Sequence, residues 1–230
     1  MDEWLSRQRR LLGDEACAVL ARARVAIAGL GGVGGAAFEA LVRAGVGSLA
    51  VCDCDVFERS NLNRQILATE SVLGERKVTA ARARAMAINP STDIAAIDLR
   101  LDEGNLSEFL EPTPDYVIDA IDSVSAKIAL IEECLRRGVP IISCMGTGNR
   151  LFADFEIVDI EKTANSGCPL ARVMRHELRS RAVERGVTVL CGKTPPIKPP
   201  DGGRSPASIS FVPPIAGYML AGHVVRELIK

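Results

Sequence analysis

The stretch GLGGVGG, residues 29–35, restricts the possible folds of this chain more than any other feature of its sequence. It follows the apolar run VAIA and precedes AAFEALVRAG, so a glycine-rich turn joins an expected strand to an expected helix. Gly29, Gly31 and Gly34 have the spacing G-x-G-x-x-G, with Gly32 between them, and free N–H groups at such a helix start attract phosphate. We therefore predict a bound nucleotide. A dinucleotide and ATP both satisfy the pattern, and close packing of strand on helix is the structural alternative.

Strand-like apolar runs alternate with segments of helical periodicity along the rest of the chain, which is typical of βαβ units. We expect strands at 24–30, 48–56, 93–101, 115–123, 140–146, 155–163 and 187–193. We expect helices from the glycines to residue 43 and at 74–90, 124–137, 168–186 and 215–230. The predicted fold class is α/β, a Rossmann-like, doubly wound, mostly parallel sheet that is extended by C-terminal strands and a helix.

The composition limits the class of protein. The chain has 230 residues, is 47% hydrophobic and has a net charge of −1, which argues against a surface devoted to nucleic acid but allows a local basic patch. No apolar run reaches the ~20 residues of a membrane-spanning helix, and the N-terminus lacks the apolar core of a secretory signal. The seven cysteines form no C-x-x-C pair, which argues against a four-cysteine zinc site and predicts reduced thiols in the cytoplasm.

Polar residues after the second expected strand discriminate between the two ligands. Asp53 lies roughly 20 residues after the glycines, where a carboxylate accepts the ribose hydroxyls of either nucleotide. Asn61, Arg64 and Gln65 follow in NLNRQ, and Lys77 lies in the next expected helix. Arg64 and Lys77 supply two cations for phosphate oxygens, which a dinucleotide does not need. Either residue, taken alone, is more often a solvated surface charge.

Asp122 lies at the end of the fourth expected strand, at the edge of the sheet where α/β proteins bind ligands. A carboxylate beside a polyphosphate would be repelled unless a cation lay between them, so Asp122 predicts a Mg²⁺ ion. A helix N-cap before VSAK is the structural alternative for this residue. Taken together, polar groups after successive strands favour ATP with Mg²⁺ over an NAD-binding module.

The motifs GLGGVGG, DCDVFERSNLNRQ, ERK and DAIDS resemble the ThiF/MoeB/HesA family, the adenylating relatives of ubiquitin-activating enzymes, over residues 7–146. The resemblance implies that Asp53 binds the ribose of ATP and that Asp122 binds Mg²⁺. It implies that the other polar residues named above bind the nucleotide and its phosphates, and that Arg64, Lys77 and Asp122 act in catalysis.

The same resemblance implies a homodimer. An N-terminal arginine would reach across the dimer to a phosphate and take part in catalysis, and Arg7 is the expected match, with Arg10 as the alternative. A monovalent cation is a further candidate ligand beside ATP and Mg²⁺, and a sulfur-transfer protein is a further candidate partner. No membrane association is expected.

The C-terminal half, with SCMGTGNRLFADFEIVDIEKT, CPLARVMRHELRSR and SISFVPPIAGYMLAG, resembles the YgdL/TcdA branch of this family. That branch comprises tRNA threonylcarbamoyladenosine dehydratases, which adenylate the carboxylate of the modified adenosine so that its carbamoyl group can close a ring. The resemblance implies that tRNA is the partner and that no enzyme thiol is needed, because both reacting groups belong to one molecule. The alternative is a ThiF/MoeB-like adenylyltransferase that activates the C-terminus of a ubiquitin-like sulfur-carrier protein, although the two zinc-binding C-x-x-C pairs usual there are missing.

The helix expected at 168–186 contains further candidates. Cys168 lies at its start, where a thiol pKa can fall, and Cys191 lies in an apolar strand, but we favour a structural role for both. Three arginines at helical spacing form a candidate surface for tRNA phosphates, with a solvated face as the alternative: Arg172, Arg175 and Arg179.

We divide the chain into three expected parts. Residues 1–23 form an N-terminal helical arm, 24–148 a Rossmann-like ATP-binding core, and 149–230 a C-terminal extension that completes the same domain. Within the extension, the proline- and glycine-rich segment 194–206 is predicted to be a mobile loop.

Overall fold

Seven strands form one sheet in the order β3-β2-β1-β4-β5-β7-β6 in the computed structural model, which describes residues 3–203 and 206–230. Residues 1–2 of the expected arm and 204–205 of the expected loop lie outside the described residues. Neighbouring strands run parallel except β6, which is antiparallel to β7. The predicted α/β fold with a mostly parallel sheet is therefore confirmed. The strands are β1 Arg24–Ala28, β2 Ser48–Cys52, β3 Asp93–Ile97, β4 Tyr116–Asp119, β5 Ile141–Cys144, β6 Phe155–Asp159 and β7 Thr188–Gly192.

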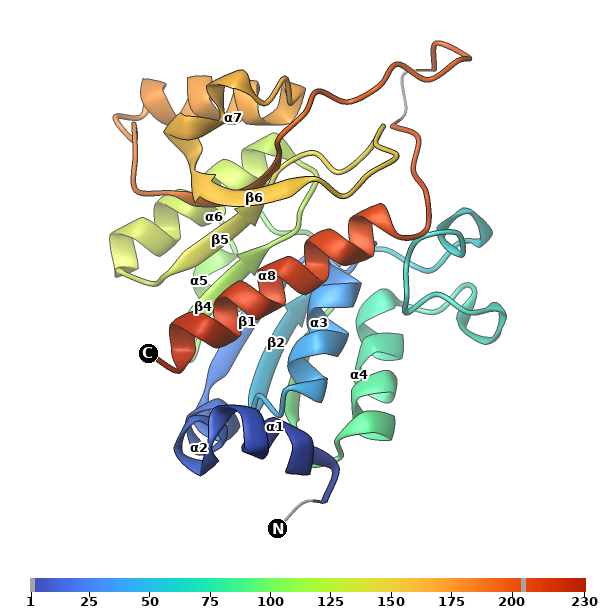
Figure 1. Ribbon diagram of the computed structural model, residues 1–230, viewed down its shortest axis with the longest axis vertical. Helices are drawn as coiled ribbons and strands as arrows, with labels where there is room; N and C mark the ends of the chain where they lie inside the picture. Colours follow the sequence, from blue (N-terminus) through green and yellow to red (C-terminus); the bar gives the residue numbers. More distant parts are fainter. Residues whose placement is uncertain (1–2, 204–205) are drawn as a thin grey trace.

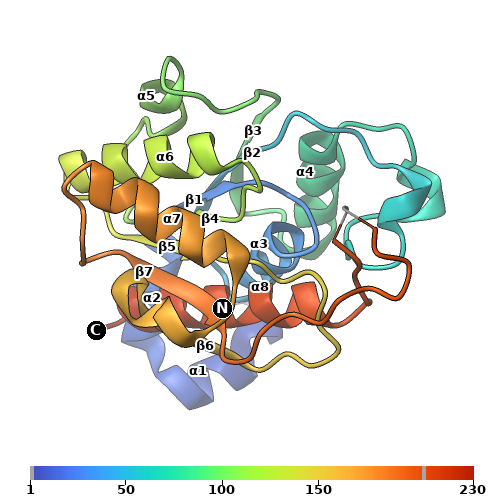
Figure 2. The ribbon, with the colours of Figure 1, turned by 90° about the horizontal axis from the view of Figure 1, so that it is seen from above.

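Helices cover both faces of the sheet (Figure 2). Along β1, Val25 and Ile27 pack into one apolar cluster and Ala26 and Ala28 into another, because side chains alternate across a strand. All four are fully buried, as expected for a parallel sheet between two helical layers. The first layer contains α3 Gly34–Arg43, α4 Lys77–Ile88 and α8 Val212–Leu228, and the second contains α5 Leu106–Phe109, α6 Val124–Arg137 and α7 Pro169–Ser180.

The N-terminal arm forms two helices at the amino ends of the strands, far from the glycine turn (Figure 1). They are α1 Ser6–Leu12, which follows a short 3-10 turn at Glu3–Leu5, and α2 Asp14–Arg22. Leu20 of α2 is fully buried, and the side chain of Gln8 donates a hydrogen bond to the carbonyl of Ala44 at 2.8 Å. The arm is thus packed against the domain.

Several expected strands end earlier than their apolar runs predict, because a carboxylate turns the chain. The Asp53 carboxylate accepts a hydrogen bond from the N–H of Asp55 at 2.8 Å, and β2 ends at Cys52 instead of residue 56. The Asp119 carboxylate accepts one from the N–H of Ile121 at 3.1 Å, and β4 ends at Asp119 instead of residue 123. Asx turns of this kind compete with the strand ladder.

Helix ends also differ from the expected ranges. The helix expected at 74–90 begins at Lys77, and the one expected at 168–186 ends at Ser180. The last helix begins at Val212, because Pro213 and Pro214 fit a first turn, where no backbone N–H is needed. Short 3-10 segments that the periodicity did not predict lie at Arg59–Asn61, Glu70–Val72 and Ile160–Asn165.

The strand order places a crevice at the carboxyl end of the sheet. The chain proceeds from β1 outward to β2 and β3, then returns to β4 on the other side of β1. Loops leaving β1 and β4 therefore diverge, and α/β proteins bind ligands at such a switch point. Across the described ranges 3–203 and 206–230, no helix is long and apolar enough to cross a membrane.

Candidate active site

A cleft of about 1230 Å³ opens at this switch point. It is lined by the glycine turn, the segment between β2 and α4, the turn after β4, the segment after β5, the start of α7 and parts of residues 196–213. Two of the residues predicted for the nucleotide site do not line it: Gly34 is buried beneath the turn, and Arg7 is exposed on α1. The other predicted nucleotide-site residues do line it: Gly29, Gly31, Gly32, Asp53, Asn61, Arg64, Gln65, Lys77 and Asp122.

The glycines of the turn have different roles. Gly29 has a φ of +90°, and a Cβ there would lie 2.7 Å from the carbonyl oxygen of Ala120. A Cβ on Gly34 would collide with the carbonyl oxygen of Gly29, so these two glycines let the turn close against the loop after β4. Gly31 has no atom within 4 Å of its ideal Cβ position and faces the open cleft.

Asp53 joins the glycine turn to the start of α4. One carboxylate oxygen accepts a hydrogen bond from the N–H of Leu30 at 2.7 Å, and the other lies 3.7 Å from Nζ of Lys77. Lys77 is the first residue of α4, and its side chain is only 7% exposed. A buried ammonium therefore lies beside the glycine turn, where phosphate is expected.

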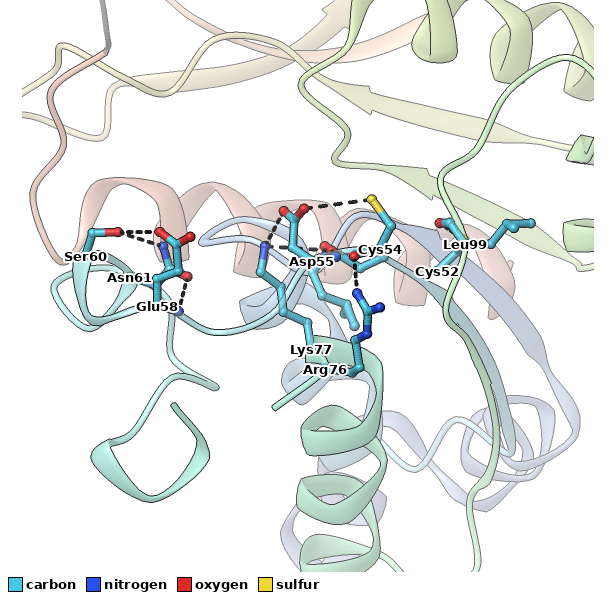
Figure 3. A network of polar contacts seen from close by, with 11 residues as sticks. Cys52, Cys54, Asp55, Glu58, Ser60, Asn61, Arg76, Lys77 and Leu99 are labelled. Atoms are coloured by element: carbon cyan, nitrogen blue, oxygen red, sulfur yellow. Dashed lines mark hydrogen bonds and ion pairs between the residues drawn. The ribbon is translucent and has the colours of Figure 1, made fainter. Parts of the chain in front are cut away.

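Asp55 was not among the predicted residues, although it belongs to the same DCD sequence. Its carboxylate lies 2.9 Å from Nζ of Lys77 (Figure 3). This hydrogen bond holds the pKa of the Asp55 carboxyl below its usual value, although burial opposes the effect. Arg76 lies beside it, donates a hydrogen bond to the carbonyl of Cys54 at 2.7 Å and pairs with Asp98 at 3.0 Å. Arg76 and Lys77 are the last two residues of the ERK motif, and a role was predicted only for the lysine.

The segment after β2 turns through its 3-10 helix and presents NLNRQ to the cleft. Asn61 is nearly buried, and its side-chain oxygen accepts a hydrogen bond from the N–H of Glu58 at 3.0 Å (Figure 3). Arg64 is half-buried and donates to the carbonyl of Ser60 at 2.9 Å. Gln65 is 6% exposed, and its buried Oε1 has no hydrogen-bond partner within the described part of the chain. This oxygen fits a donor on a ligand, because buried acceptors are rarely left unpaired.

Asp122 lies on the turn between β4 and α6, exposed at the cleft. Its carboxylate forms no hydrogen bond or ion pair with the residues at 3–203 and 206–230, and Ser123 occupies the N-cap position of α6. The N-cap alternative for Asp122 is therefore wrong. A free carboxylate at the mouth of an anion site fits a divalent cation, which prefers oxygen ligands.

A buried ion pair that the sequence did not predict fixes this turn. Lys127 and Asp119 are completely buried, with Nζ and the carboxylate 2.9 Å apart. Lys127 also donates to the carbonyl of Ile121 at 3.0 Å, and Ser143 donates to Asp119 at 2.5 Å. No role was predicted for Lys127, which lies between Ala126 and Ile128 in the helical segment VSAKIALI.

The candidate tRNA-facing arginines lie on α7. Arg172 and Arg179 are exposed, and Arg175 is half-buried and donates a hydrogen bond to the hydroxyl of Thr163 at 2.6 Å. Arg172 and Arg175 line a separate hollow of about 250 Å³ that Cys168 also borders. The buried residues of α7 are Ala171, Met174 and Leu178, so Arg175 lies at the edge of the buried side while Arg172 and Arg179 are exposed beside it.

The sequence profile of the ThiF family matches residues 5–230. A tRNA threonylcarbamoyladenosine dehydratase of Bacillus subtilis is 37% identical to this chain, over 98% of the chain and 94% of that protein. The crystal structures of E. coli tRNA N6-threonylcarbamoyladenosine dehydratase, TcdA, in complex with AMP and with ATP superpose with TM-scores of 0.92 and 0.91, at 29% identity, over 100% of this chain and 96% of theirs.

The alternative branch matches a smaller part of the chain. A molybdopterin-synthase adenylyltransferase of Haemophilus influenzae is 35% identical over 73% of this chain and 68% of its own length. The B. subtilis dehydratase thus matches nearly the whole chain, including the C-terminal extension, as the sequence motifs implied. This chain therefore belongs to the ThiF family, in the branch of the tRNA threonylcarbamoyladenosine dehydratases.

Proposed function

We propose that this protein is an ATP-dependent dehydratase that cyclises threonylcarbamoyladenosine in tRNA. The observation that carries the proposal is the similarity to the B. subtilis dehydratase over 98% of the chain, which includes every residue that lines the cleft. The bound ATP and AMP of the E. coli structures belong to that protein, and we infer an equivalent nucleotide in the cleft of this one.

The cleft residues have the chemistry that adenylation requires. The carboxylate of the modified adenosine attacks the α-phosphorus of ATP, and the bond to the leaving pyrophosphate breaks. Negative charge grows on the phosphate oxygens, and Lys77, Arg64 and the N–H groups of the glycine turn can stabilise it. In the bound nucleotide, Asp53 accepts hydrogen bonds from the ribose hydroxyls, and Asn61 and Gln65 contact the rest of the nucleotide.

A Mg²⁺ ion would be held by Asp122, whose carboxylate has no partner within the described residues. Such an ion would neutralise part of the charge on the phosphates. The turn that carries Asp122 is rigid because Lys127 and Asp119 bind both the N–H and the carbonyl of Ile121. A monovalent cation remains a further proposed ligand.

Ring closure needs no enzyme nucleophile in this scheme. The carbamoyl group attacks the adenylated carbonyl carbon, and AMP leaves, so the substrate loses the elements of water while ATP becomes AMP and pyrophosphate. Both reacting groups belong to one bound molecule, which supplies a high effective concentration.

The proposal extends to the assembly. We propose a cytoplasmic homodimer in which Arg7 of one subunit reaches the phosphates bound by the other, because Arg7 is exposed and does not line the cleft of its own chain. We also propose that Arg172, Arg175 and Arg179 contact tRNA phosphates, which the exposure of Arg172 and Arg179 on α7 supports. We further propose that a sulfur-transfer protein can associate.

Nucleoside mass spectrometry tests the function. Incubation of the protein with ATP, Mg²⁺ and threonylcarbamoyladenosine-containing tRNA is expected to convert the nucleoside to a form lighter by one water. An unchanged nucleoside mass would refute the dehydratase. Pyrophosphate exchange that depends on a sulfur-carrier protein and ignores tRNA would favour the adenylyltransferase instead.

Single substitutions test the site. Lys77→Ala and Asp122→Ala are each expected to reduce turnover by roughly 100-fold or more, since charged contacts to phosphate contribute about 1.5–3 kcal/mol each and also stabilise the transition state. Glu70→Ala, an exposed acidic residue outside the cleft, is the matched control. Full ATP binding and turnover in both site variants would disprove the assignment.

A further inference from the structure

Asn149 has an uncommon backbone conformation at the edge of the cleft. Its φ is +58°, and it is one of two non-glycine residues with a positive φ in the described part of the chain. Asparagine tolerates this left-handed region better than most residues, but a non-glycine residue stays there only where its surroundings hold it. Asn149 follows β5 and lines the cleft, so its contacts show what holds it.

Three hydrogen bonds join Asn149 to the C-terminal part of the chain. Its N–H donates to the carbonyl of Ala207 at 2.7 Å, and its side-chain Oδ1 accepts from the N–H of Ala207 at 2.7 Å. Its carbonyl accepts from the N–H of Ile197 at 2.8 Å. A single residue after β5 thus binds two separate points of the segment that follows β7.

The residues beside these bonds form a wall of the cleft. Pro196, Pro206 and Ser208 all line it. A Cβ on Gly148 would lie only 2.6 Å from Cβ of Pro206, so the missing side chain lets the proline pack directly against this glycine. Because a proline ring fixes its own φ, the wall has little freedom once its neighbours are held.

The same wall is also held from the nucleotide side of the cleft. Nδ2 of Asn63 donates to the carbonyl of Ser208 at 3.2 Å, and Oδ1 of Asn63 accepts from Nη1 of Arg64 at 2.9 Å. Ser208 is half-buried, and its Oγ is buried without a hydrogen-bond partner among residues 3–203 and 206–230. Since buried polar atoms are rarely left unpaired, this hydroxyl fits a polar group of a ligand.

The strand order places Asn149 away from the predicted nucleotide residues. Those residues follow β1, β2 and β4, whereas Asn149 follows β5 and Ile197 follows β7, which lie beyond β4 in the sheet. The cleft of about 1230 Å³ is also larger than the roughly 300–1,000 Å³ that is usual for one small molecule. The part beside β5 and β7 therefore has room for a second substrate next to the nucleotide.

We propose that Asn149 is a positioning residue for the acceptor substrate, the nucleoside whose carboxylate ATP activates. Asn149 acts through its hold on Pro196, Pro206 and Ser208, which form the wall against which this substrate lies. Placement matters because a displacement of about 1 Å can lower a rate by roughly 100-fold. The identity of the acceptor rests on the proposed function, whereas the attachment of the wall to Asn149 does not.

A kinetic comparison tests the role of Asn149. Asn149→Gly keeps the left-handed backbone and removes only the side chain, so the wall loses the bond at Ala207. We expect the KM for threonylcarbamoyladenosine-containing tRNA to rise roughly tenfold, while the Kd for ATP, measured by calorimetry, stays within about twofold of wild type. An unchanged KM for tRNA, or an equal rise in the Kd for ATP, would overturn the assignment.

A second variant perturbs the wall without touching Asn149. Gly148→Ala places a methyl group against Pro206 and should raise the KM for tRNA in the same way, again with ATP binding retained. Ala182→Gly is the matched control, because Ala182 has the other positive φ, +62°, and does not line the cleft. Its KM for tRNA should equal that of wild type. A rise in this control as large as in Asn149→Gly would show a general effect of backbone freedom.

Hydrogen exchange of the backbone amides tests the attachment without any turnover. The N–H of Ala207 should exchange about fivefold faster in Asn149→Gly than in wild type, and Asn149→Asp, which keeps the acceptor oxygen, should restore its protection. Unchanged exchange in Asn149→Gly would refute the attachment whatever the substrate is. A wild-type protein that leaves modified tRNA unchanged would refute the proposed function, whereas wild-type KM values in folded Asn149→Gly and Gly148→Ala would refute the positioning role alone.

Discussion

Gly31 and Gly34 lie three residues apart in one turn, but the space around them differs. Gly31 has no atom within 4 Å of its ideal Cβ position, while a Cβ on Gly34 would meet the carbonyl oxygen of Gly29. At the scale of single residues, the G-x-G-x-x-G pattern therefore combines one glycine that faces the proposed ligand with one that permits the turn itself. The sequence spacing alone cannot separate these two roles, because it records only the missing side chains.

Substitution with alanine should separate them. Gly31→Ala is expected to keep the wild-type free energy of unfolding within about 0.5 kcal/mol but to weaken ATP binding, because its methyl group projects into the cleft. Gly34→Ala is expected to lose about 1–3 kcal/mol of stability, because the methyl group forces the turn open. Urea unfolding and ATP titration by calorimetry measure the two effects. Equal stability losses in both variants would contradict this division of roles.

At the scale of elements, helices and strand centres were predictable and their ends were not. Apolar runs identified the strands because the sheet is buried on both faces, and α6 was located at its observed bounds. Strand ends were set by the Asp53 and Asp119 carboxylates, whose hydrogen bonds to the backbone leave no periodic signal. The same reason explains why Asp122 was expected to end a strand, although it lies on a turn beyond β4.

Lys77 at the start of α4 and Lys127 of α6 each form ion pairs near the cleft, and a further ion pair joins two whole helices. Glu39 of α3 accepts hydrogen bonds from Arg84 of α4 at 2.9 Å and from Arg43 at 2.9 Å. Burial alone would raise the pKa of the Glu39 carboxyl, but these arginines outweigh it and lower the pKa. This contact joins the helix after the glycine turn to the helix that begins with Lys77, so it fixes the two phosphate-facing elements relative to each other.

The lowered pKa of Glu39 predicts an acid-sensitive contribution to stability. A carboxyl whose folded pKa lies below the unfolded value of about 4.3 stabilises the fold above that pH and loses this effect as the pH falls through the folded pKa. Glu39→Gln should be about 1–3 kcal/mol less stable than wild type at neutral pH, and the difference should shrink in acid. Urea unfolding across pH measures it. Glu70 forms an exposed pair with Arg59, so the stability of Glu70→Gln should follow the same pH dependence as that of wild type. The same pH dependence in Glu39→Gln would contradict the argument.

The buried pair of Lys127 and Asp119 gives a second prediction at this scale. Lys127→Met leaves a completely buried carboxylate without its cation, so about 3–5 kcal/mol of stability should be lost. The double variant Lys127→Met with Asp119→Leu removes both charges and should recover most of that loss. In the double variant, the turn that carries Asp122 still lacks both hydrogen bonds to Ile121. Its Mg²⁺- and ATP-dependent turnover should therefore remain impaired.

Urea unfolding and the Mg²⁺ dependence of pyrophosphate release measure these two effects separately. A double variant with wild-type stability and wild-type Mg²⁺ dependence would show that the pair supports the fold without positioning Asp122.

The cleft is a property of the whole molecule, since residues from Gly29 to Pro213 line it. The sequence pattern located its first half, because charged residues after parallel strands converge on one edge of a sheet. The second half could not be located in this way. Arg150, Cys168 and the segment around Pro196 and Pro206 reach the cleft through the folding of the C-terminal extension, which no local periodicity encodes.

Arg7 is the predicted site residue whose role depends on the assembly of two chains. It lies on α1, at the opposite end of the strands from the glycine turn (Figure 1), and does not line the cleft of its own chain. A contribution to catalysis therefore requires a second subunit. If Arg7 acts across a homodimer, each active site takes Asp122 from one chain and Arg7 from the other, and two different inactive variants can complement each other.

Mixing Arg7→Ala with Asp122→Ala tests this arrangement. After exchange of subunits, half of the dimers are mixed, and each mixed dimer has one site with both residues intact, so we expect about a quarter of wild-type turnover from two nearly inactive parents. Turnover is measured by pyrophosphate release with modified tRNA. Mixing Lys77→Ala with Asp122→Ala is the matched control, because both residues line the cleft of one chain and no mixed dimer gains an intact site. Equal recovery in both mixtures, or none with Arg7→Ala, would contradict a shared site.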